Sequence, residues 1–179
     1  MNRFGWVVVV ALLTLGSYNT WQRAHDPRNN RAAYTITKLE PFQIEARVLS
    51  TCRYRWDREA VLAPVDLALG WGPMADPTVL SQLTISQDGR WYTFQWRGGG
   101  PPIPEDDIIA HSANMHMIPA DDDVARTLKQ IRRDQQIELR GYLVEAVGPD
   151  GWRWRSSLSR TDTGGHACEL VLVESMTVR

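Results

Sequence analysis

Histidine and cysteine side chains are the groups of this 179-residue chain that could bind a metal ion. His111 and His116 lie five residues apart, and His166 and Cys168 follow near the C-terminus. Imidazole and thiolate are ligands that suit zinc. If the chain turns at Asn114, these four side chains could converge on one zinc ion.

A zinc ion held in this way would support a metal-dependent hydrolase built on His111, His116 and His166, with Asp162 or Glu169 nearby. The five-residue spacing matches no recognised metal-binding motif, and a continuous helix would point the two imidazoles in different directions. We therefore expect no cofactor, with zinc as the alternative. In the simpler interpretation, the histidines hydrogen-bond to loop carbonyl groups and hold the loops in place.

Cys52 and Cys168 are the two cysteines of the chain, and both lie on predicted strands. If the domain is exported, one disulfide between them would stabilise it by roughly 2–4 kcal/mol. Two buried free thiols, which behave as small hydrophobic side chains, are the alternative.

Tryptophan and arginine are unusually frequent. The chain has eight Trp, and only Lys38 and Lys129 among its 20 basic residues are lysine. On two predicted hairpins these side chains could form an aromatic and cationic platform that binds a partner. The platform would consist of Trp91, Trp96, Trp152, Arg153, Trp154 and Arg155. Tryptophans buried in a sheet core are the alternative.

Alternation of apolar and polar residues predicts the strands that position these groups. One long alternating run begins at Phe42 and continues to Tyr54, with Leu49 as the exception. The turn signal Asp88-Gly89 predicts a hairpin of residues 83–86 and 90–96.

A second hairpin is predicted around Pro149-Asp150-Gly151, between residues 137–143 and 152–158. Because residues two apart in a strand share a face, Trp152 and Trp154 should lie opposite to Arg153 and Arg155. A last strand is expected from Cys168 to about Val173.

The clearest helix signal covers Asp122 to about Arg133, where Val124, Leu128 and Ile131 form one apolar stripe. Acidic residues at its start and arginines at its end match the helix dipole. Residues 64–73 contain several glycine and proline residues and predict one or two short helical turns.

Together these elements predict a mainly β, α+β domain over residues 34–179, with one or two helices and an inserted segment at about 60–82. We expect a small closed or partly open β-barrel of the oligonucleotide/oligosaccharide-binding (OB) type, with a two-sheet sandwich as the alternative. A content of 43% hydrophobic and 23% charged residues fits one globular domain. The net charge of −1 gives no overall basic field, so nucleic acid is not the expected partner.

Residues 1–22 are expected to form a transmembrane anchor or an uncleaved signal, followed by a polar linker at 23–33. Residues 4–21 carry no charge and are long enough to span a bilayer as a helix, with Trp6 and Trp21 near the ends. We expect a single pass through a bacterial inner membrane, with the C-terminal domain in the periplasm. A cleaved signal peptide is the alternative.

Three strings resemble segments of uncharacterised bacterial proteins that have one N-terminal membrane segment. They are PVDLALGWGPM (64–74), HSANMHMIPA (111–120) and DGWRWRSSLSRTDTGGHACELVLVES (150–175). The similarity covers most of the chain after about residue 40. It implies a bacterial, membrane-anchored protein, and it implies neither an activity nor catalytic residues.

The sequence therefore favours a non-enzymatic, membrane-tethered, extracytoplasmic binding or assembly module whose partner is a protein or a glycan. The metal-dependent hydrolase is the second hypothesis. A purely structural role of the polar motifs is the third.

Overall fold

The computed structural model describes residue 26, residues 30–159 and residues 168–179. The predicted anchor, most of the linker, Asp162 and His166 lie outside the described residues. None of the helices in the described part of the chain has the length and apolar composition that a membrane span requires.

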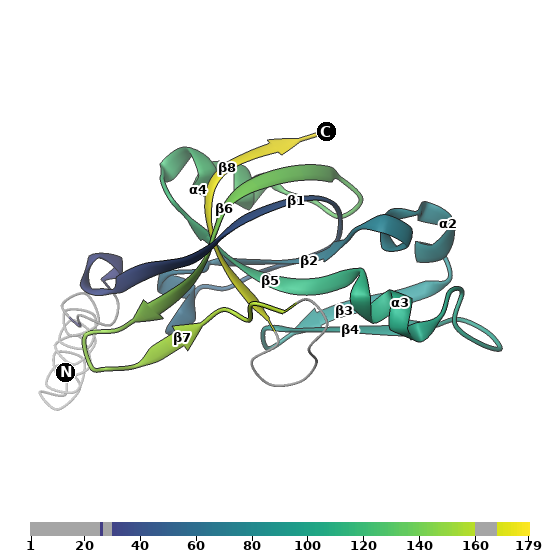
Figure 1. Cartoon of the computed structure of the whole chain (residues 1–179), viewed down its shortest axis with the longest axis horizontal. Helices are drawn as coiled ribbons and strands as arrows, with labels where there is room; N and C mark the ends of the chain where they lie inside the picture. Colours follow the sequence, from purple (N-terminus) through teal and green to yellow (C-terminus); the bar gives the residue numbers. More distant parts are fainter. Residues whose placement is uncertain (1–25, 27–29, 160–167) are drawn as a thin grey trace, which may run out of the picture.

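Five strands pair into a ring, and the described part of the chain is mainly β (Figure 1). The order is β1-β2-β5-β8-β6, and β6 pairs again with β1. The parallel pair is β5 with β8, and the other ring pairings are antiparallel. The strands are β1 (Thr35–Arg53), β2 (Val65–Gly70), β5 (Ser112–Pro119), β6 (Gln136–Val147) and β8 (Glu169–Val178).

β1 closes the ring because its two halves have different neighbours. Residues 35–47 pair with β6, and residues 47–53 pair with β2. The register with β2 shifts between Val48 and Ser50, which marks a β-bulge. This bulge explains why Leu49 breaks the alternation. Val48 packs inside the ring, whereas Leu49 packs in a separate apolar cluster.

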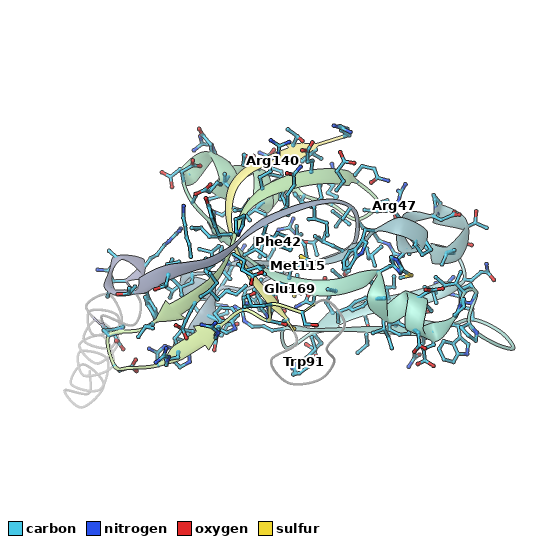
Figure 2. All side chains as sticks on the ribbon, in the orientation of Figure 1. Phe42, Arg47, Trp91, Met115, Arg140 and Glu169 are labelled. Atoms are coloured by element: carbon cyan, nitrogen blue, oxygen red, sulfur yellow. The ribbon has the colours of Figure 1, made fainter. Side chains whose placement is uncertain are left out.

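The main apolar core fills the interior of the ring, where Phe42 and Met115 lie near the centre of the molecule (Figure 2). Helix α4 (Asp122–Gln130) adds the predicted stripe of Val124, Leu128 and Ile131 to this core. Burial of such side chains is the main favourable term in folding. The predicted helix is thus confirmed, although the α-helical backbone ends at Gln130 rather than near Arg133.

Strand β2 corrects one expectation. The glycine and proline content of residues 64–73 predicts helical turns, but Val65–Gly70 is a strand in which all six residues are buried. Its two neighbours are β1 and β5, and both of its faces are covered. A strand that is buried on both faces shows no alternation of polar and apolar residues, so periodicity cannot reveal it.

Residues 71–111 connect β2 to β5 and include the predicted first hairpin. Gly89 and Arg90 form its two-residue turn with φ angles of 53° and 69°, as in a type I′ turn. The hairpin packs on the outer face of β2 through an apolar cluster that includes Leu83, Ile85 and Ala68. The elements of this segment are η4 (Gly72–Ala75), α2 (Pro77–Leu80), β3 (Leu83–Asp88), β4 (Trp91–Trp96) and α3 (Glu105–Ala110).

The remaining elements are short. The chain enters the domain through η2 (Arg31–Ala33), and residues 54–64 with η3 (Glu59–Val61) join β1 to β2. The insertion predicted at about 60–82 thus overlaps this loop, β2 and the start of the connection to β5. β7 (Arg153–Arg155) pairs with the end of β6 and confirms the second predicted hairpin.

Candidate functional site

A buried polar network lies on the outer face of the ring, where β2 and β5 meet the turn of the β3–β4 hairpin. Asp66 in β2 and His116 in β5 are register partners, with Asp66 Oδ2 2.9 Å from His116 Nδ1. The same oxygen lies 3.4 Å from Asn114 Nδ2, and Asp66 Oδ1 accepts a hydrogen bond of 3.1 Å from Arg90 Nη1. Asp66 and His116 are 0% and 4% exposed, so the pair is enclosed by protein.

Arg90 connects three parts of the molecule. Besides Asp66, its guanidinium pairs with Asp57 at 2.7 Å and donates to the carbonyl oxygen of Ala63 in the β1–β2 loop. Its backbone N–H donates to the hydroxyl of Tyr54, and its carbonyl oxygen accepts from Asn114 Nδ2. A charge placed among so many partners fixes the hairpin turn against both the loop and the ring.

Two tyrosines of this region have raised pKa values. Burial raises the pKa of Tyr54 far above its ordinary value, and the hydrogen bond to Cys52 and the charge of Asp66 act in the same direction. Burial raises the pKa of Tyr92 to about 12, although its hydrogen bond to Ser112 acts the other way. Both phenols are therefore neutral near pH 7 and serve as hydrogen-bonding groups.

Trp154 covers the network, and Trp152 continues the aromatic layer. The Trp154 ring lies 4.8 Å from the His116 ring and 5.4 Å from the Arg90 guanidinium. The Trp152 ring lies 5.9 Å from Trp154 and carries the Arg58 guanidinium 4.6 Å above it. These two tryptophans, predicted to belong to a binding platform, pack inward beside an apolar cluster on the ring.

The structure does not bring the six platform residues onto one face. Arg153 and Arg155 are exposed and share an ion pair with Glu145, at 3.0 and 3.7 Å. Trp91 and Trp96 are 51% and 37% exposed, but their odd spacing places them on opposite faces of β4. Trp91 points away from the ring at the edge of the molecule (Figure 2).

The histidines of the predicted zinc site have different partners. His111 ends α3, where its Nδ1 lies 2.9 Å from the carbonyl oxygen of Asp107, whereas His116 faces Asp66. His166 lies outside the described residues. Within the described ranges, no group of three or more His, Cys, Asp or Glu side chains could hold a metal ion. Zinc stays a prediction.

Both cysteines are partly exposed in the structure, and no disulfide joins Cys52 to Cys168. Cys52 is the register partner of Asp66, and Cys168 immediately precedes β8. On that side of the ring, β2 and β5 lie between β1 and β8. Neighbouring strands are about 4.8 Å apart, and a disulfide requires Cα atoms within roughly 7 Å. The register thus agrees with two separate thiols.

Sequence reasoning assigned no role to Trp56, the most exposed large hydrophobic residue of the described chain at 89%. It lies in the loop after β1 and immediately precedes Asp57, the partner of Arg90. Trp91 immediately follows Arg90. Two exposed tryptophans therefore flank the two ends of one ion pair. Their signal in the sequence is a tryptophan among charged residues, Arg55-Trp56-Asp57-Arg58, where the strand alternation stops.

Three segments distant in the sequence meet in this network, namely 64–74 with Asp66, 111–120 with His116 and 150–175 with Trp154. They are the segments that carry the resemblance described above. No protein-family model matches the chain, and no curated protein matches it.

Proposed function

We propose that this chain is a membrane-tethered, extracytoplasmic binding or assembly module that docks a protein partner through Trp56 and Trp91. The observation that carries the proposal is the exposure of these two rings, 89% and 51%, beside a fixed ion pair. Exposed large aromatic side chains are typical of interaction sites, and tryptophan is enriched among the residues that dominate binding energy.

The backbone beneath the two rings is held in place before any partner arrives. Asp57 accepts from Arg90 and also from the backbone N–H of Ala60, which orders the loop around Trp56. Arg90 is fixed in turn by Asp66. A surface that is already ordered loses little conformational entropy on binding, and this raises affinity without additional contacts.

The strand order supports an OB-type barrel as the architecture of the module. The OB fold is a five-stranded Greek-key barrel that binds ligands on its second and third strands and on the loop between strands one and two. In the ring, the second and third strands along the chain are β2 and β5, which carry the network. The corresponding first loop is 54–64, which carries Trp56.

The tether would place this surface close to the membrane. Residues 4–21 are the proposed anchor in a bacterial inner membrane, and the chain then enters the domain at η2 and Tyr34. Tyr34 packs edge-on against Trp152 with a centroid distance of 6.0 Å, and Arg58 lies 5.8 Å from the Tyr34 ring. The loop of Trp56 is thus at the end of the domain where the tether attaches.

The buried Asp66–His116 pair connects the ring to Arg90 and Asn114 beneath the proposed surface. Asp66 lies against Arg90, Asn114 and His116 Nδ1, and both members of the pair are buried. The pair thus acts as an internal support of the surface beside it.

Photo-crosslinking in living bacteria tests the proposal on the full-length chain. A benzophenone amino acid would replace Trp56 or Trp91 in turn, and Arg126 on the exposed side of α4 would serve as the control position. We expect one discrete protein adduct from both tryptophan positions and none from Arg126. Adducts that a glycosidase removes would reassign the partner to a glycan. The absence of any adduct specific to the two tryptophan positions would refute the docking surface.

A further inference from the structure

A basic cleft lies where α4 ends against the second half of β1, and the network and exposed tryptophans have no part in it. Its volume is about 790 Å³. Clefts of roughly 300–1,000 Å³ hold small organic ligands. The polar side chains that line it are Thr51, Arg53, Thr127, Lys129, Gln130, Arg132 and Gln135.

The charged side chains that line this cleft are all positive. Arg53, Lys129 and Arg132 line it, and no carboxylate does. None of the three cations forms an ion pair with another described residue. The chain as a whole has a net charge of −1, so the three unpaired cations form a local positive field rather than part of a basic surface.

Arg53 is held in a fixed position within the cleft. Its Nη2 donates to the carbonyl oxygens of Lys129 and Ile131 at the end of α4, at 2.9 Å each. The Nε and Nη1 donors of Arg53 make no hydrogen bond with the described residues. A planar guanidinium fixed in this way presents a fork of donors that suits an oxyanion.

Thr51 supplies a second, independent indication of a ligand. Its Oγ1 is buried at the cleft and has no hydrogen-bond partner among the described residues. A buried hydroxyl without a partner is unfavourable unless another group completes its hydrogen bonds. Basic residues near the C-terminus of a helix can be present only because they interact favourably with the helix dipole. That role does not explain why the hydroxyl of Thr51 has no hydrogen-bond partner.

We propose that this cleft binds the phosphoryl group of a phosphorylated small molecule or headgroup. Three cations without a carboxylate call for a ligand with more than one negative charge, and a phosphomonoester carries about −1.5 to −2 near pH 7. Arginine and lysine are the usual phosphate ligands in proteins. The cleft is larger than a phosphate ion, and Ile131 and Val178 provide an apolar wall for the organic part of the ligand.

Calorimetric titration of the full-length chain in detergent tests the proposal, with glycerol 3-phosphate as the probe and glycerol as the uncharged control. We expect saturable binding of glycerol 3-phosphate only. Arg132→Gln should weaken it about tenfold, the loss of one charged hydrogen bond. Arg126→Gln is the matched control on the same helix, because Arg126 pairs with Asp123 outside the cleft. No saturable binding, or equal losses in both variants, would overturn the proposal.

Two further measurements identify the molecule that carries the phosphoryl group and the role of Thr51. Nanodiscs that contain phosphatidic acid, whose headgroup is a phosphomonoester, and nanodiscs of phosphatidylcholine alone replace the free probe. Binding that requires phosphatidic acid assigns the phosphoryl group to a lipid. Thr51→Val removes the unpartnered hydroxyl and should weaken binding without lowering the melting temperature. Unchanged binding in Thr51→Val would show that this hydroxyl does not face the ligand and would remove the second support of the proposal.

Discussion

The carboxylate of Asp66 lies 2.9 Å from the imidazole of His116, its direct register partner across β2 and β5. A carboxylate this deeply buried is costly unless charges and hydrogen bonds compensate it. Arg90 and Asn114 supply that compensation, one from the β3–β4 turn and the other from β5. Because Arg90 also pairs with Asp57, its guanidinium connects the ring to the loop that carries Trp56.

Arg90→Ala should destabilise the domain strongly. It leaves the carboxylate of Asp66 buried without its cation, and removal of one partner of a buried pair costs about 3–5 kcal/mol. Urea unfolding measures the loss. Arg97→Ala at the end of the same hairpin is the control, because that side chain is exposed and, among the described residues, bonds to Thr84 alone. A loss no greater than that of the control would contradict the role of Arg90.

Stability should fall as the pH rises from 10 to 12. Burial raises the pKa of Tyr92 from 10.0 to about 12, so in this range the unfolded chain has lost the phenolic proton that the folded chain still binds. Since the unfolded state then binds fewer protons, the free energy of unfolding decreases with pH. Tyr92→Phe should make this decrease shallower.

The same substitution removes the hydrogen bond from Tyr92 to Ser112, which is present at every pH below the folded pKa. Unfolding curves near pH 8 measure that loss alone, and the difference between pH 8 and pH 11 isolates the ionisation. An identical pH slope in the variant and the natural chain would show that Tyr92 does not carry the effect.

Gly141→Ala should prevent stable folding. A Cβ on this residue of β6 would lie 1.8 Å from the carbonyl oxygen of Leu172 in β8, at the point where the register between the strands shifts. Backbone atoms within a sheet cannot move aside, so we expect a loss of about 3 kcal/mol or more. Gly99→Ala, where a Cβ meets nothing within 4 Å, should leave the melting temperature almost unchanged.

Asp121→Ala should cost about 1 kcal/mol through the loss of a helix cap. The Asp121 side chain accepts a hydrogen bond of 2.9 Å from the backbone N–H of Val124 in the first turn of α4. Asp122→Ala is the comparison, since Asp122 shares the first turn without capping it. If urea denaturation gave equal losses for both variants, the helix dipole rather than the cap would be responsible.

Local signals in the sequence predicted the elements whose causes are local. The Asp88-Gly89 signal marked the first hairpin, and the acidic start with the stripe of Val124, Leu128 and Ile131 marked α4. The alternation in β1 also identified Leu49 as irregular, which the bulge explains. β2 was not predicted, because a strand covered on both faces has no periodic pattern of polar and apolar residues.

The network and the basic cleft could not be predicted in the same way. Asp66 and Arg90 are 24 residues apart, and Arg53 contacts the carbonyl group of Lys129 over 76 residues. These pairs meet only after β1, β2 and β5 have paired, and no single window of the sequence contains both partners. The shared face of Trp152 and Trp154 was predicted, but the direction in which that face points depends on what β7 packs against.

The closed pairing of the ring has a consequence for the way in which a partner can bind. β2 pairs along its whole length with β1 on one side and with β5 on the other, so it offers no row of free backbone N–H and C=O groups. Among the described strands, unpaired edges remain on the β3–β4 hairpin, on β7 and along each half of β1, which pairs on one side with β6 or with β2. A partner of this domain cannot add a strand beside β2, so its recognition of the surface over the buried network has to come from side chains.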